Sequence, residues 1–164
     1  EEMIDGYIAF AAGEGDEAPQ DIAIESVVKR LVTQAHKSHK FDIIMSPVKD
    51  EIPAFPMRRN AIQRAFSNII SNAIRYSSKT IVHIQKRNDE VIVTFDDNGS
   101  GIPEERRADA IRPFIRLEES RNRRTGGTGL GLSITSDIVL SHGGELTLGE
   151  SPLGGLRVSI KLPI

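Results

Sequence analysis

Apolar side chains recur every three or four positions in three stretches of the chain, and this spacing is typical of one face of an amphipathic helix. The predicted helices cover residues 22–37, 60–76 and 128–141. The most regular apolar stripe belongs to the second helix and consists of Ile62, Ala65, Phe66, Ile69, Ile70 and Ala73. Asp21 stands where it could cap the first helix, and residues 103–111 predict a further short helix.

Short runs rich in β-branched residues lie between the predicted helices and indicate strands. They cover residues 41–45, 51–55, 80–85, 91–95, 145–149 and 156–162. The polar residues 87–90 join the third and fourth runs, which predicts an antiparallel hairpin. Strands grouped in this way, with helices between them, predict an α+β fold: a two-layer sandwich with one mixed, mostly antiparallel sheet under a helical layer.

The composition is that of one ordinary globular domain. The 164 residues are 38% hydrophobic, which is enough for a substantial core in a chain of this length. A net charge of -2 gives no overall attraction to nucleic acid or to an anionic membrane, so no nucleic-acid partner is expected. The absence of cysteine excludes disulfides, thiolate zinc sites and thiol catalysis.

The first twenty residues differ in character from the rest. Residues 1–12 again show helical spacing, and residues 13–20 are polar, contain glycine and predict a linker. Residues 21–164 then form the main domain. Because the sequence opens with Glu-Glu-Met and lacks a signal peptide, we interpret it as a piece of a longer protein.

A glycine-rich cluster follows the strand predicted at residues 91–95. It contains Asp97, Gly99 and Gly101. Glycine at a strand end lets the backbone approach a ligand closely, and a fixed carboxylate can accept a hydrogen bond from an exocyclic amine. Taken alone, the same motif is also typical of a surface turn.

A second glycine-rich cluster opens the helix predicted at residues 128–141. It runs through Gly126, Gly127, Thr128, Gly129, Leu130 and Gly131. Free backbone N–H groups at a helix N-terminus, together with the helix dipole, bind anions such as phosphate. The cluster is not a Walker A loop, since no Gly-Lys-Ser/Thr follows, and no strand precedes it as in a Rossmann fingerprint.

Two asparagines one helical turn apart, Asn68 and Asn72, form the third candidate cluster. Their amide oxygens are suitable ligands for a hard cation such as Mg²⁺. A solvated polar helix face is the alternative interpretation.

Taken together, these clusters match a known family over residues 21–164. The matching residues are Asn68, Asn72, Ala73, Arg75 and Tyr76; Asp97, Gly99 and Gly101; Pro113, Phe114 and Arg116; and Gly127, Thr128, Gly129, Leu130, Gly131 and Leu132. In chain order they resemble the N, G1, F and G2 boxes of sensor histidine kinases, which have the Bergerat (GHKL) ATP-binding fold. Residues 3–11 resemble the end of the second helix of the dimerisation domain, and residues 56–65 resemble the osmosensor (EnvZ-like) branch.

The resemblance implies a role for each cluster. Asp97 would receive the adenine amino group, with Gly99 and Gly101 beside it and Tyr76 lining the pocket. Asn72, together with Asn68, would hold Mg²⁺. Catalytic roles fall to Asn68 and to two arginines that would face the phosphates, Arg75 and Arg116. The backbone from Gly126 to Gly131, with Gly127, Thr128, Gly129 and Leu130 between them, would cradle the triphosphate of ATP under a mobile lid at residues 112–127.

The resemblance also implies partners and leaves two alternative functions open. The γ-phosphate would pass to a histidine of a dimerisation domain outside this sequence and then to the aspartate of a response regulator, because His36, His39, His83 and His142 all lack the acceptor motif. The isolated piece would be a monomeric cytoplasmic domain, and the parent a homodimer anchored in the bacterial inner membrane.

ATP-hydrolysing relatives such as type II topoisomerases, Hsp90-like chaperones and mismatch-repair ATPases place a Glu where this chain has Asn68. An amide cannot take a proton from water at neutral pH, so this position favours a kinase. A non-catalytic nucleotide-binding regulatory module is the other alternative, and the intact boxes disfavour it.

Overall fold

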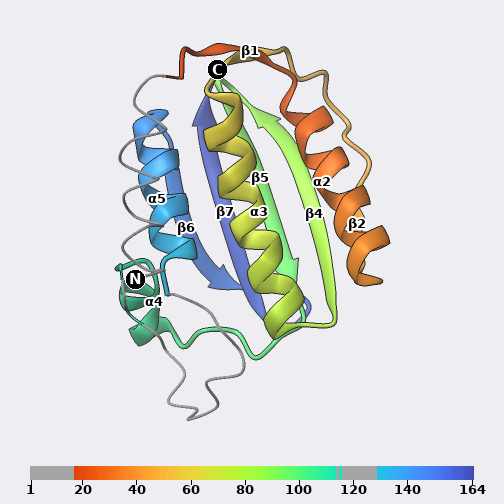
Figure 1. Ribbon diagram of the computed structural model, residues 1–164, viewed down its shortest axis with the longest axis vertical. Helices are drawn as coiled ribbons and strands as arrows, with labels where there is room; N and C mark the ends of the chain where they lie inside the picture. The colour runs from red at the N-terminus through yellow and green to blue at the C-terminus, as the bar shows by residue number, and fades with distance from the viewer. Residues whose placement is uncertain (1–16, 114, 116–128) are drawn as a thin grey trace.

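The computed structural model describes residues 17–113, 115 and 129–164. Figure 1 shows a layer of helices lying over a sheet. The described helices are α2 (Ile24–His39), α3 (Arg59–Tyr76), α4 (Glu104–Ala110) and α5 (Gly131–Ser141). The strands are β1 (Gln20–Ile22), β2 (Asp42–Met45), β3 (Phe55–Met57), β4 (Lys79–Arg87), β5 (Glu90–Asp97), β6 (Glu145–Glu150) and β7 (Leu156–Pro163).

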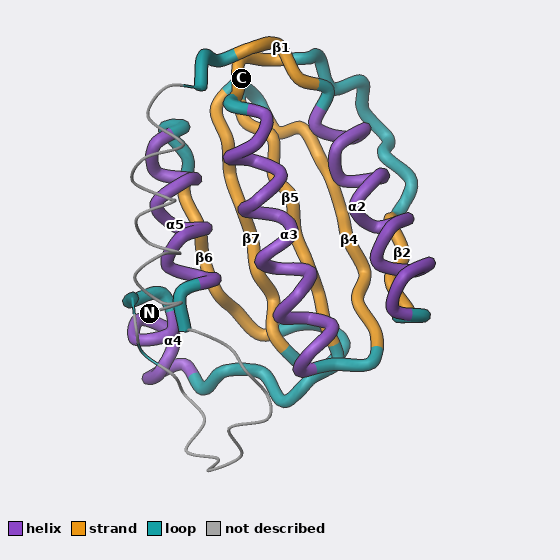
Figure 2. Tube along the Cα trace, viewed as in Figure 1, coloured by secondary structure: helices purple, strands orange, loops and turns teal. Residues whose placement is uncertain are grey.

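The main sheet has five strands in the order β2-β4-β5-β7-β6. Only the β2–β4 pair is parallel, and the other three pairs are antiparallel. Helices α2, α3 and α5 lie side by side over one face of this sheet (Figures 1 and 2). The predicted α+β sandwich with a mixed, mostly antiparallel sheet is therefore confirmed.

The core lies between α3 and the central strands. The predicted stripe of α3 is buried throughout, with Phe66 fully inaccessible to solvent. Its ring packs against Phe95 of β5, with 5.9 Å between the ring centroids. Burying a large apolar side chain of this kind contributes about 1.5–3 kcal/mol. This packing fixes α3 over β5, and thereby fixes the asparagines of α3 relative to the end of that strand.

The opposite face of the sheet carries an ion pair between the buried Asp96 and the partly exposed Arg157. Arg157 of β7 donates to both carboxylate oxygens of Asp96 in β5, over 2.7 and 2.8 Å. This hydrogen bond to Asp96 raises the pKa of the Arg157 guanidinium above its ordinary value. Such a two-bond fork ties β5 to β7 next to Asp97.

The N-terminal part of the described chain corrects two predictions. Asp21 does not cap a helix: it lies in β1, and α2 begins after Ala23 with no side-chain cap. The strand predicted at residues 51–55 is instead β3 (Phe55–Met57), which pairs with β1 in a separate two-stranded sheet. This pairing joins segments far apart in the sequence. It places Asp21 in a strand, opposite Pro56, so Asp21 is not at a helix start.

Residues 1–16 lie outside the described residues, so the predicted helix at 1–12 and most of the linker at 13–20 are untested. Glu17 is the first described residue. Its carboxylate accepts hydrogen bonds from the backbone N–H groups of Asn60 (2.9 and 3.2 Å) and Ala61 (3.3 Å). A carboxylate in this position satisfies donors that the first turn of α3 leaves without helical partners.

Candidate nucleotide-binding site

Four segments that carry the candidate residues meet at one end of the sandwich. The C-terminal end of α3, the end of β5 and the β6–β7 turn lie at the lower end of the sandwich in Figure 1, and the start of α5 lies somewhat above them, beside α3. The strand directions produce this meeting, because β5 and β6 both run toward that end and α3 ends there. The three sequence clusters therefore share one region of the fold.

Asp97 is the anchored carboxylate of this region. It ends β5 and is 9% exposed. Its Oδ1 accepts hydrogen bonds from the backbone N–H groups of Gly99 (2.8 Å) and Leu156 (2.9 Å). No donor among the described residues pairs with Oδ2. One oxygen thus orients the carboxylate, and the other remains available to a ligand amine.

Three glycines make this geometry possible. A Cβ on Gly99 would stand 2.4 Å from the Tyr76 carbonyl oxygen, so the loop after β5 can pass the end of α3 only as glycine. A Cβ on Gly155 would stand 2.2 Å from Oδ1 of Asp97. Gly101 adopts a φ of +68°, in the left-handed region that favours glycine. Gly155 was not among the predicted site residues.

Asn68 and Asn72 lie on α3 and face the start of α5. The Asn68 amide nitrogen donates to the Gly131 carbonyl oxygen over 3.3 Å. A Cβ on Gly131 would stand 3.7 Å from the Asn72 side-chain nitrogen and 3.8 Å from the Asn68 Cβ. Both asparagines are partly buried. The structure therefore brings the predicted asparagine pair together with the described part of the second glycine cluster.

The residue types in this region are compatible with Mg²⁺. Among residues 17–113, 115 and 129–164, no three His, Asp or Glu side chains gather into a metal-binding cluster. An ion held here would rely on the amide oxygens of Asn68 and Asn72 and on phosphate oxygens. Mg²⁺ is commonly held in this way, by few protein ligands together with substrate phosphates and water.

Arg75 and Tyr76 end α3 beside the loop after β5. The Arg75 guanidinium carbon lies 5.9 Å from the centre of the Tyr76 ring, a distance that permits a cation–π contact. The Tyr76 side chain is 41% exposed, an unusual exposure for a large aromatic residue. This exposed ring, next to Gly99, is a surface on which a flat ligand could pack.

The start of α5 is only partly described. Gly129 has a φ of +71°, so the chain cannot be helical there, and α5 begins at Gly131 and not at the predicted residue 128. Leu130 is buried, and its carbonyl oxygen accepts from the Ile134 N–H over 2.9 Å. Phe114, Arg116, Gly126, Gly127, Thr128 and most of the predicted lid lie outside the described residues.

The fold and the site define an α+β nucleotide-binding module in which a strand-end carboxylate and a glycine-rich helix start lie near a pair of asparagines. The chain belongs to the family of histidine kinase-, DNA gyrase B- and HSP90-like ATPases, whose model matches residues 57–164. A curated relative is the sensor histidine kinase CpxA of Escherichia coli K12, which is 44% identical over 106 residues. That match covers 64% of this chain and 23% of CpxA.

Solved structures agree with this assignment. The histidine kinase domain of the E. coli osmosensor EnvZ is 30% identical, with a TM-score of 0.67 and 92% of each chain covered. The ATP-binding domain of PrrB from Mycobacterium tuberculosis is 26% identical, with a TM-score of 0.71, covering 90% of this chain and 97% of that one. The predicted family is confirmed: this is an ATP-binding catalytic domain of the histidine kinase type.

The chain spans less than a third of the length of the curated relatives it matches. Those relatives are named as sensor proteins and sensor histidine kinases. In the part of the chain that the structure describes, no helix has both the length and the apolar character needed to cross a membrane.

Proposed function

We propose that this chain binds Mg·ATP and transfers the γ-phosphate to a histidine of a dimerisation domain, which then passes it to the aspartate of a response regulator. In the first transfer, the imidazole nitrogen forms a bond to the γ-phosphorus while the bond to the bridging oxygen breaks, leaving ADP. Positioning and charge neutralisation are most of what such a transfer requires from a protein. The parent would be a homodimer anchored in the bacterial inner membrane, with this domain in the cytoplasm.

The observation that carries the proposal is the half-anchored carboxylate of Asp97. With Oδ1 held by two backbone N–H groups, Oδ2 can accept a hydrogen bond from the amino group of adenine. Guanine presents a carbonyl oxygen at the corresponding position, so two acceptors would face each other. Gly99, Gly101 and Tyr76 would complete the surroundings of the base.

The remaining site residues would act on the phosphate end of the nucleotide. When bound, Mg²⁺ would neutralise phosphate charge, with Asn72 and Asn68 as its protein ligands. Arg75 and Arg116 would face the phosphates. Backbone N–H groups of residues 127–131 would bind phosphate oxygens at the start of α5.

Asp97→Asn tests the proposal at the base. Asparagine keeps an oxygen that can accept from Gly99 and Leu156, but it turns an N–H₂ group toward the adenine amine. We expect ATP binding to weaken by about 1.5–3 kcal/mol, the range for a hydrogen bond to a charged group. Calorimetry with ATP and GTP measures this change, and an unchanged ATP affinity would remove Asp97 from the site.

Phosphotransfer in trans tests the proposed reaction. The chain with labelled ATP should not label itself, because none of its four histidines has the acceptor motif. Adding a histidine-containing dimerisation domain as a separate polypeptide should yield slow, Mg²⁺-dependent phosphohistidine on that domain. Steady ATP hydrolysis by the chain alone would instead favour the ATPase alternative, and acid-labile phosphate on this chain would contradict the division of labour.

A further inference from the structure

Thr80 carries a buried hydroxyl that the fold leaves unpaired. It is the one buried side-chain nitrogen or oxygen atom without a hydrogen-bond partner in the part of the chain that the structure describes. The residue is 0% exposed and shares the helix-covered side of β4 with Val82 and Ile84. Leaving a buried hydroxyl unpaired costs about 1–3 kcal/mol. Valine would occupy nearly the same volume without this penalty. We therefore expect the hydroxyl to have a hydrogen-bond partner that is not a protein atom.

The position of Thr80 connects it to the candidate site. Thr80 and Asp97 are direct partners in the antiparallel β4–β5 ladder, so their side chains lie on the same side of the sheet. The Cβ atoms of such a pair are about 4.5–5.5 Å apart. The Asp97 oxygen without a partner among the described residues is Oδ2. An unpaired donor and an unpaired acceptor are therefore carried by directly paired residues on the same side of the sheet, an arrangement that a single bridging water would satisfy.

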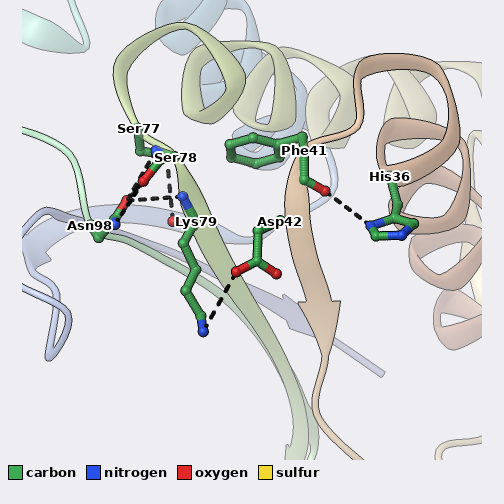
Figure 3. Close-up of polar contacts among 7 residues, drawn as sticks. All are labelled: His36, Phe41, Asp42, Ser77, Ser78, Lys79 and Asn98. Atoms are coloured by element: carbon green, nitrogen blue, oxygen red, sulfur yellow. Dashed lines mark hydrogen bonds and ion pairs between the residues drawn. The ribbon is translucent and has the colours of Figure 1, made fainter.

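Asn98 holds the two strands in this register. Its side-chain Oδ1 accepts hydrogen bonds from the backbone N–H groups of Ser78 (3.0 Å) and Lys79 (2.9 Å). The backbone N–H of Asn98 donates to the Lys79 carbonyl oxygen over 3.2 Å. Figure 3 shows the Asn98 side chain directed at the turn from α3 into β4. Because this clamp lies next to the Thr80–Asp97 pair, the two side chains have little freedom to separate.

We propose that Thr80 is a positioning residue of the adenine site, whose hydroxyl donates to a single buried water that in turn donates to Oδ2 of Asp97. The water keeps Oδ2 directed at the base, while Gly99 and Leu156 hold Oδ1. Thr80 acts through Asp97 and does not touch the nucleotide. The inference rests on the proposed role of Asp97 as the adenine acceptor.

Two variants of Thr80 separate the hydroxyl from the shape of the side chain. Thr80→Val keeps the volume and removes the hydroxyl, whereas Thr80→Ser keeps the hydroxyl and removes a methyl group. A matched control is Ile84→Val, which also removes one carbon from the same side of β4. For each, calorimetry gives the Kd for ATP and for purine riboside triphosphate, which lacks the 6-amino group, and urea unfolding gives the midpoint.

We expect opposite effects of the two substitutions. Thr80→Val should unfold at nearly the same urea concentration as the parent chain, because its volume is kept, but bind ATP roughly two- to tenfold more weakly, as for the loss of one hydrogen bond. Its preference for ATP over purine riboside triphosphate should fall by a similar factor. Thr80→Ser and Ile84→Val should unfold at lower urea while binding ATP within about twofold of the parent, because neither removes a hydrogen bond.

The outcomes distinguish this inference from the proposed function. A Thr80→Val chain that binds ATP as the parent does would overturn the role of Thr80 and leave Asp97 in place. Equal losses of affinity in Thr80→Val and Thr80→Ser would also overturn it, since the hydroxyl would not be the cause. If Asp97→Asn itself left ATP affinity unchanged, the adenine site would be wrong, whatever the Thr80 variants show.

Discussion

Gly155→Ala tests how the fold supports Asp97, at a position far in sequence from the residues proposed to bind ATP and Mg²⁺. Gly155 lies in the turn between β6 and β7, directly against the end of β5. A Cβ at this position would stand 2.2 Å from Oδ1 of Asp97, 2.4 Å from the Gly99 nitrogen and 2.6 Å from the Asp97 carbonyl oxygen. Two of these three atoms belong to the backbone, so no side-chain rotation can relieve the clash. The turn and the end of β5 must move apart.

The hydrogen bonds at the contact give the size of the effect. Separation would break the bond from the Gly155 N–H to the Asp97 carbonyl oxygen (3.2 Å) and the one from the Leu156 N–H to Oδ1 of Asp97 (2.9 Å). The first is a neutral pair, worth about 0.5–1.5 kcal/mol, and the second has a charged acceptor, worth about 1.5–3 kcal/mol. We therefore expect the free energy of unfolding to fall by about 2–4.5 kcal/mol.

The same displacement should also lower the affinity for ATP. Without the Leu156 N–H, only Gly99 holds Oδ1, and the carboxylate can turn away from the base. We expect ATP binding by calorimetry to weaken at least tenfold, or about 1.4 kcal/mol. Urea unfolding of the same sample measures the stability change separately.

A second alanine in the same hairpin provides the control. A Cβ on Gly149 of β6 would meet only the Arg157 Cβ, at an ordinary 3.9 Å. Gly149→Ala should therefore change the free energy of unfolding by less than about 0.5 kcal/mol and leave ATP affinity intact. If Gly155→Ala matched Gly149→Ala in both measurements, the proposed support of Asp97 by this turn would be refuted.

Three further predictions follow from the same geometry. Asn72→Ala should weaken Mg·ATP more than metal-free ATP, because the amide oxygen is proposed to contact the cation; calorimetry with and without Mg²⁺ would contradict this role if the losses were equal. Gly99→Ala should lower both stability and ATP affinity, because its Cβ would overlap the Tyr76 carbonyl oxygen; normal urea unfolding would show that the loop can move aside. Arg157→Lys should lower the free energy of unfolding by up to about 1 kcal/mol, because lysine cannot form the two-bond fork with Asp96 and Arg157 is partly exposed. The pKa of Arg157 is raised in the folded chain, so its contribution is complete below the unfolded-state value and is lost only in strong alkali. The difference in free energy of unfolding between the parent and the Arg157→Lys chain, measured in urea, should therefore stay constant from about pH 6 to pH 9, where arginine and lysine are both charged.

The sequence predicted those parts of the fold whose signal is local. The apolar stripe of α3 and the run of β-branched residues in β5 are signals carried by neighbouring residues, and both elements formed where the sequence predicted them. Strand β1, by contrast, has three residues and no periodicity of its own. It exists because β3 pairs with it. This long-range pairing leaves no local signal, so the sequence around Asp21 wrongly predicts a helix start.

The residues of the candidate site likewise fall into those with a local sequence signal and those that depend on long-range packing. Asp97, Asn68 and Asn72 stand in short motifs whose chemistry can be recognised from the residues themselves. Gly155 matters only because a distant turn packs on Asp97, and in the sequence it marked nothing more than a loop. Thr80 lies in a run of β-branched residues, where a buried hydroxyl looks the same as any other strand position.

The packing of α3 against α5 adds a physical argument to the prediction that asparagine at position 68 favours a kinase over a hydrolase. An amide can donate to the Gly131 carbonyl through its nitrogen and still offer its oxygen to a cation. A glutamate has no donor at neutral pH, so it would set a carboxylate against that carbonyl oxygen. The Thr135 hydroxyl of α5 donates to the carbonyl oxygens of Gly131 (2.8 Å) and of Ala65 in α3 (3.3 Å), so the two helices are held together at this point. To place a general base here, the start of α5 would have to move away from α3. In the proposed function, Asn68 would therefore both join the helices and leave an attacking water without a general base.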